Sequence, residues 1–165
     1  KSMNIIEATS NETIDAIKRD TSAFDNYIKE LKQKIAEGNV IFYGAHDGNS
    51  FVGRVCLIRV PEEQVVRDIL PGQPALVALQ INESARRRGI GSQLVTAVMA
   101  KARSLGYQKI SLGVEAGNQA GKSLYEKLGF VYEGHNYESC WNEPDGEGGL
   151  KRVCVNALLM VKELG

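Results

Sequence analysis

The sequence lacks several features that would mark a specialised class of protein. Its 165 residues carry 20 basic and 20 acidic side chains, so no net charge favours nucleic acid or an anionic membrane surface. No apolar run approaches the ~20 residues that a membrane-spanning helix requires. No basic segment followed by an apolar core marks a secretory signal. We therefore expect a cytoplasmic protein without nucleic-acid or membrane partners, in which any anion site is local.

Cysteine is also scarce, with three residues at Cys56, Cys140 and Cys154. None of them forms a Cys-x-x-Cys pair, the spacing typical of zinc sites, and we expect no bound metal. An odd count, with two of the three in apolar strand-like runs, predicts buried and reduced thiols.

What is present indicates a globular chain with a core. Apolar residues make up 43% and charged residues 24% of the sequence. The length suits a single domain over residues 1–165. The predicted fold class is α/β, a mixed α+β sheet with helices packed on it.

The order of elements follows from hydrophobic periodicity. Alternating or apolar runs predict seven strands, at residues 3–9, in the two arms of a hairpin within 39–60, and at 75–81, 108–114, 130–139 and 151–164. Helical spacing and terminal glycines predict helices over residues 10–38, 89–106 and 119–129. The Pro-rich segment 61–74 is predicted to be a loop or a short helix, and residues 142–149 a polar turn.

The stretch "GNQAGKS" at residues 117–123 looks like the phosphate-binding loop of nucleotide hydrolases. That loop requires G-x-x-x-x-G-K-[ST], because its length sets how many backbone N–H groups converge on the phosphates. Here only three residues separate Gly117 from Gly121, and the later apolar strand "VCVNALLMV" offers no carboxylate for magnesium. The nucleotide-hydrolase interpretation therefore fails.

A better anion site lies in "ARRRGIGSQLV" (residues 85–95), between a predicted strand and a predicted helix. Gly89 and Gly91 let the backbone approach an anion closely. The free N–H groups of a first helical turn point at such an anion, and the helix dipole assists. Three arginines at 86–88 add positive charge. The dinucleotide pattern G-x-G-x-x-G is not met, because Leu94 stands where it requires glycine.

Two motifs together resemble the GCN5-related N-acetyltransferase (GNAT) superfamily: [Q/R]-x-x-G-x-[G/A] before a helix and, one strand later, N-x-x-x-x-x-L-Y-E-K-x-G-F. The matching residues are Arg86, Gly89, Gly91, Asn118 and "LYEKLGF" from Leu124 to Phe130. The resemblance is specific over the core cofactor motifs at 76–135, weaker over the N-terminal half, and fades after Tyr137. It implies an acyl-CoA N-acyltransferase fold with about seven strands, helices on both faces and splayed central strands.

The resemblance also implies acetyl-CoA as co-substrate. In this superfamily the pyrophosphate rests on the amides of the Gly loop, the pantetheine arm pairs with the preceding strand, and an Asn-led helix closes the other side. The cofactor-binding residues implied in this way are Leu79, Ile81, Arg86, Arg87, Arg88, Gly89, Ile90, Gly91, Ser92, Asn118, Lys122 and Tyr125. Lys122 meets either a phosphate or solvent, and Gly121 departs from the small residue such as Ala that is usual there.

Acetyl transfer to an amine requires a neutral amine, a polarised thioester carbonyl and a proton for the departing thiolate. The resemblance assigns the proton donor to Tyr125, with a purely structural role as the alternative, and a backbone N–H near Ile81 to the carbonyl. Relatives often carry a glutamate on the strand that here reads "ALVALQI", which has none. The remaining candidates for the general base are a water relay, Glu83, Glu115 and His135.

The predicted activity is N-acetylation of a primary amine by direct attack in a ternary complex, with a catalytically silent acyl-CoA-binding module as the alternative. The acceptor is a small-molecule or peptide amine, and a homodimer is compatible with the sequence. Residues 20–35, 61–74 and 135–149 are expected on the acceptor side, where Tyr137, Trp141 and nearby acids would form an aromatic and acidic lip. The competing interpretation is a solvated turn with Trp141 packed on the sheet.

Overall fold

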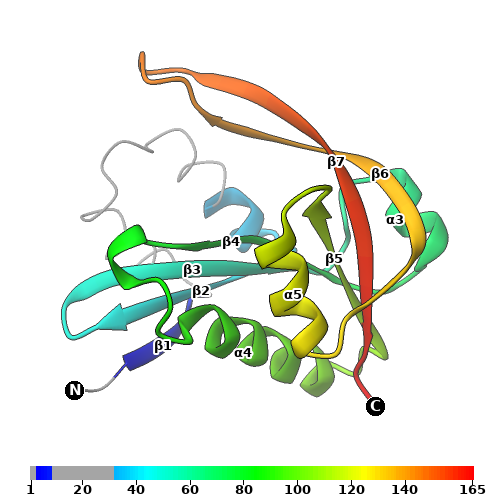
Figure 1. Cartoon of the computed structure of the whole chain (residues 1–165), viewed down its shortest axis with the longest axis horizontal. Coiled ribbons are helices and arrows are strands. Elements are labelled where there is room, and N and C mark those ends of the chain that lie inside the picture. Colours follow the sequence, from blue (N-terminus) through cyan, green and yellow to red (C-terminus); the bar gives the residue numbers. More distant parts are fainter. Residues whose placement is uncertain (1–2, 9–31) are drawn as a thin grey trace.

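The computed structural model describes residues 3–8 and 32–165. Seven strands form one mixed sheet in the order β1-β2-β3-β4-β5-β7-β6 (Figure 1). The strands are β1 Met3–Ala8, β2 Val40–Asp47, β3 Ser50–Ile58, β4 Ala75–Ile81, β5 Lys109–Glu115, β6 Val131–Pro144 and β7 Leu150–Glu163. The helices between them are α3 Gln64–Ile69, the 3-10 turn η2 Glu83–Ala85, α4 Ile90–Ser104 and α5 Gln119–Lys127.

All seven predicted strands are confirmed, as are the helices after β4 and β5. The predicted helix at 10–38 falls largely on residues 9–31, outside the described part. Its end is confirmed, because residues 32–36 are helical and Gly38 follows with a φ of +79°. The Pro-rich segment contains the short helix α3. β6 is longer than predicted, since residues 142–144 pair with 150–152 and leave a shorter turn.

Helices cover both faces of the sheet, as predicted. On one face, α4 buries the residues that recur at three- and four-residue steps: Leu94, Val95, Val98 and Ala102. Tyr125 of α5 joins the same core cluster. On the other face, Ile35, Val66 of α3 and the C-cap residue Leu70 pack on the sheet. None of the described helices has the length and apolar composition needed to cross a bilayer.

The side chains of β5 alternate between the two faces of the sheet. The residues of β5 that join the α4–α5 core are Ile110, Leu112 and Val114. Successive side chains of a strand point to opposite faces. Gly113 and Glu115 therefore belong to the face that carries α3.

The outer parts of β6 and β7 form a two-stranded arm that extends beyond the rest of the sheet (Figure 1). Trp141 lies on this arm, 42% exposed, and its Nε1 donates to Glu143 Oε2 at 3.1 Å. The interpretation in which Trp141 packs on the sheet is therefore wrong. At the tip, the Asp145 carboxylate accepts hydrogen bonds from the amides of Glu147 and Gly149 and so closes the turn.

Cys140 and Cys154 are register partners across this arm and form a disulfide. The prediction of reduced, buried thiols is wrong for these two, because cross-strand register cannot be read from spacing alone. It is confirmed for Cys56, which is free and buried, and burial raises the pKa of its thiol to about 12. Among the described residues, the one group with metal-ligand chemistry is this disulfide with Glu138, and it offers no thiolate.

Thiol counting tests this arrangement. Native protein kept without reductant should incorporate no maleimide, because two sulfurs are bonded to each other and Cys56 is buried. Unfolding without reductant should expose one reactive thiol, and reduction should then raise the count to three. Intact-mass spectrometry reads each count directly. Three reactive thiols in unreduced, unfolded protein would contradict the disulfide.

Candidate active site

Two central parallel strands, β4 and β5, pair only at their beginnings. Ala75 and Ser111 are the single register pair between them, and the Ser111 amide donates to the Pro74 carbonyl at 3.2 Å. Beyond that point no ladder joins the two strands, both of which lie wholly within the described residues. Their facing backbone groups are therefore left without strand partners. The predicted splayed central strands are confirmed.

The separation coincides with an irregularity in β4. The register with β3 shifts between Arg54 and Cys56, and Ala78 adopts a φ of 60°. A residue with a side chain rarely takes this left-handed conformation in a strand, and holding it there costs about 1–3 kcal/mol. Bulges of this kind redirect a strand and concentrate near active sites. The bulge thus turns the rest of β4 away from β5.

The helix that follows β4 begins with free amides. Gly89, the N-cap residue, has a φ of 76°, and no side chain caps the helix. The Gln93 amide is bonded to the Gly89 carbonyl at 3.1 Å. The preceding amides of the helix, which have no intrahelical acceptor, are those of Ile90, Gly91 and Ser92.

The tip of α4 lies where β4 and α5 meet. Ile90 is buried and anchors the first turn in the core. A Cβ on Gly91 would lie 3.5 Å from Leu124 of α5 and 4.0 Å from Ile81 of β4. The free amides, the open edge of β4 and α5 therefore border one region of the surface.

The three arginines before α4 have different surroundings. Arg86 Nε donates to the Ile81 carbonyl at 3.4 Å. Arg88 Nη2 pairs with Asp47 Oδ2 at 2.9 Å, so its charge is balanced. Arg87 is exposed and has a φ of 68°. The net positive charge beside the helix tip therefore comes from Arg86 and Arg87.

Asn118 caps the start of α5. Its Oδ1 accepts a hydrogen bond from the Gly121 amide at 3.0 Å. A Cβ on Gly121 would lie 2.7 Å from Asn118 Nδ2, so glycine makes room for the cap. The cap uses the oxygen and leaves the amide N–H₂ as a donor. Next to it, the Lys122 ammonium lies over the Tyr132 ring, 5.7 Å from its centroid.

Tyr125 is buried on α5, with its ring 6.0 Å from that of Phe130 in an edge-to-face arrangement. Phe130 is itself a core residue. Burial raises the pKa of the Tyr125 hydroxyl to about 12. No described residue is a hydrogen-bond partner of its hydroxyl. Within the described part of the chain, the one side-chain atom that is both fully buried and unpartnered is His46 Nδ1. The Tyr125 hydroxyl therefore reaches accessible space.

The three side chains predicted as candidates for the general base are all exposed and lie on different elements. Glu83 is in η2, beyond the end of β4, and Glu115 ends β5. His135 lies between Tyr132 and Asn136, where the β6–β7 register shifts. The structure thus does not bring these three together into a cluster.

A polar group that the sequence analysis did not identify lies on the face opposite α4 and α5. Tyr137 of β6 reaches across β7, so that its hydroxyl lies against Gly113 of β5, where a Cβ would collide with it. Ser139 of β6 and Glu63, the N-cap residue of α3, lie beside it. We call Glu63, Tyr137 and Ser139 the α3-face cluster.

Burial dominates the electrostatics of the α3-face cluster. It raises the pKa of the Glu63 carboxyl, with a further upward contribution from the charge of Glu62. It also raises the pKa of Tyr137 to about 12, reinforced by the charge of Glu63. Hydrogen bonding with Ser139 opposes both shifts.

Comparison with known proteins agrees with this geometry. The acetyltransferase (GNAT) family model matches residues 7–130. The chain is similar to an N-acetyltransferase from Staphylococcus aureus Mu50, with a TM-score of 0.70 and 17% identity over 100% of both chains. It is also similar to a GNAT-family acetyltransferase from Streptococcus pneumoniae, with a TM-score of 0.67 and 21% identity over 98% of this chain and 99% of the other.

A third similar structure is the PaiA N-acetyltransferase from Thermoplasma acidophilum in complex with coenzyme A. Its TM-score is 0.64, with 18% identity over 99% of each chain. No curated protein sequence matches the chain. The family model spans well over half of the chain and includes the open strand pair, the tip of α4 and Tyr125. The protein therefore belongs to the acetyltransferase (GNAT) family.

Proposed function

We propose that this protein transfers the acetyl group of acetyl-CoA to a primary amine, by direct attack within a ternary complex. One observation carries the proposal: free helix-tip amides and an open strand edge border the same region as α5, the helix that carries Tyr125. The first feature suits a diphosphate, and the second suits an extended arm that contains amides. Family membership and the coenzyme A complex of the Thermoplasma relative support this choice of donor.

The tip of α4 would hold the diphosphate. The amides of residues 90–92 converge there without acceptors, and the positive end of the helix dipole favours an anion. Gly89 supplies the left-handed turn that brings the backbone close. Arg86 and Arg87 add charge in a chain with no net charge of its own.

The open edge of β4 would hold the pantetheine arm. Leu79 and Ile81 lie beyond the last pair with β5, so their backbone groups on that side have no strand partner. Asn118 offers its amide N–H₂ from the start of α5. The thioester then lies in the gap, with its carbonyl near the backbone N–H groups at the end of β4.

Tyr125 would protonate the thiolate as the C–S bond breaks. Its raised pKa keeps the hydroxyl protonated at every working pH, so the donor is always in the required form. The core around the ring fixes its position on α5. A catalytically silent acyl-CoA-binding module, the alternative function, gives no role to a hydroxyl held in this way.

Substitution of Gly89 tests the diphosphate site. Gly89→Asp should weaken coenzyme A binding at least about 100-fold, because a carboxylate ~4 Å from a phosphate costs about 4 kcal/mol at a surface-like dielectric. Gly89→Asn is the matched control, since asparagine has the same shape, no charge, and tolerates a positive φ. Its effect should stay within about 5-fold. Calorimetry measures both, and equal affinities for the two variants would contradict the site.

Substitution of Tyr125 tests the proton donor. Tyr125→Phe should lower kcat about 100-fold or more and change coenzyme affinity less than about 3-fold, because the ring and its packing remain. Tyr132→Phe is the control, since that hydroxyl is bonded to Asn136 instead. Thiol release measures kcat, and the wild-type rate should show no alkaline loss from this group well below pH 12. Equal losses of kcat and coenzyme affinity would assign Tyr125 a packing role.

A further inference from the structure

We propose that the α3-face cluster is the amine-binding end of the active site and that Glu63 accepts the proton of the acceptor's ammonium group. This inference rests on the proposed acetyl transfer. It names a general base, which the residues assigned so far do not supply. None of the three candidates considered from the sequence belongs to the cluster. Four features of the structure support this assignment.

The first is position. β4 and β5 are in register at Ala75 and Ser111, so two residues further along, Val77 and Gly113 face one another across the gap. The Tyr137 hydroxyl lies against Gly113 on the face opposite α4 and α5. Tyr137 of the α3-face cluster therefore lies at the separated strands, on the face opposite to the one where the coenzyme is proposed to enter. An amine held there approaches the thioester from the free side.

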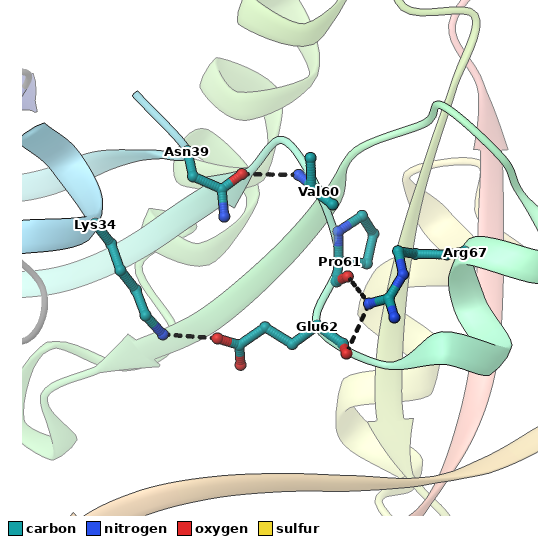
Figure 2. Close-up of polar contacts among 6 residues, drawn as sticks. All are labelled: Lys34, Asn39, Val60, Pro61, Glu62 and Arg67. Atoms are coloured by element: carbon teal, nitrogen blue, oxygen red, sulfur yellow. Dashed lines mark hydrogen bonds and ion pairs between the residues drawn. The ribbon is translucent and has the colours of Figure 1, made fainter. Parts of the chain in front are cut away.

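The second is that Glu63 has no ion pair within the part of the chain that the structure describes. Its neighbour Glu62 is paired with Lys34, whose Nζ lies 2.7 Å from Oε2 (Figure 2). The Arg67 guanidinium donates to the Pro61 and Glu62 carbonyls at 2.6 and 2.8 Å (Figure 2). No described residue forms an ion pair with Glu63. A partly buried carboxylate that forms no ion pair with the described residues is costly, and an alkylammonium ligand would supply a counter-ion.

The third is how the chain directs this side chain. After β3, the Val60 amide donates to Asn39 Oδ1 at 2.9 Å, which fixes the start of the connection (Figure 2). Val66 and Leu70 then fasten α3 to the sheet. Glu63 is the N-cap residue of α3, yet its carboxylate makes no capping hydrogen bond. The Ser139 hydroxyl of β6 instead interacts with this carboxylate and lowers its pKa.

The fourth is proton affinity. Burial raises the pKa of Glu63 above the value of about 4.3 that is usual for glutamate, which makes it a better base near neutral pH. The charge of Glu62 acts in the same direction, while Arg67 and the Ser139 hydroxyl act against it. Tyr137 stays neutral and adds no charge. The base is ionised only above this raised pKa, so activity should have an acidic limb.

The proton balance of the reaction is complete with these groups. The ammonium gives one proton to Glu63, and the neutral nitrogen attacks the thioester carbonyl to form the C–N bond. As the C–S bond breaks, Tyr125 gives its proton to sulfur. The second proton lost by nitrogen restores the Tyr125 hydroxyl through solvent, and Glu63 releases its own proton to solvent.

The test compares Glu63→Gln with Glu62→Gln, an adjacent and equally conservative control. For alkylamines, kcat/KM should fall about 100-fold or more in the first variant and less than about 3-fold in the second. Hydroxylamine, which is neutral at pH 8, needs no base, so Glu63→Gln should acetylate it within about 5-fold of wild type. The acidic limb of the alkylamine profile should be lost in Glu63→Gln. Equal losses for both nucleophiles would overturn the inference.

Two controls separate this inference from the proposed function. Coenzyme A affinity should be the same in wild type and Glu63→Gln. If the wild type neither binds acetyl-CoA nor releases thiol, the proposed function itself is wrong. Glu63→Gln should be at least as thermostable as wild type at pH 8. The raised pKa means that the ionised carboxylate destabilises the fold above that pKa, and glutamine removes this charge.

The ionisation of Glu63 and its contact with an amine can also be tested without turnover. Carbon NMR of glutamate-labelled protein, with Glu63→Gln to assign the signal, should show Glu63 titrating above the usual glutamate range. Adding n-butylamine to the coenzyme A complex should shift that signal. If Glu63 titrates in the usual glutamate range and its signal does not shift with the amine, the inference is overturned. This holds even if no tested amine is acetylated.

Discussion

The limited pairing of β4 with β5 is the constraint on which the rest of the structure depends. One register pair holds the strands together, and beyond it the bulge at Ala78 turns β4 away. If the two strands were fully hydrogen-bonded, the sheet would be continuous and no acyl chain could reach from one face to the other. The cost of the strained residue and of the unmade ladder is offset by cores on both faces of the sheet.

The two faces of the gap divide the charges between them. On the α4–α5 face, free amides suit an anionic coenzyme, as do Arg86 and Arg87, which form no ion pair with the described residues. On the α3 face, a carboxylate that forms no ion pair with the described residues suits a cationic amine. A chain with 20 basic and 20 acidic residues therefore achieves two opposite local fields without a net charge. In the proposed reaction, Tyr125 and Glu63 would act on opposite sides of one carbonyl.

Features carried by contiguous residues could be predicted from the sequence. The Gly89–Gly91 turn, the helix that starts after Asn118 and the seven strands each follow from a few neighbouring residues. Glu63 could not be chosen over Glu62, because the difference depends on Lys34, 28 residues earlier, and on Ser139. The disulfide likewise depends on the β6–β7 register. Such pairings are set by the packed sheet and leave no local pattern.

A crystal structure of the protein soaked with coenzyme A tests the central claim most directly. The account predicts the diphosphate within hydrogen-bond distance of the amides of residues 90–92. It also predicts the pantetheine arm along the open edge of β4 and the sulfur beside the Tyr125 hydroxyl. A coenzyme bound elsewhere, or strands β4 and β5 joined along their length with nothing between them, would contradict it.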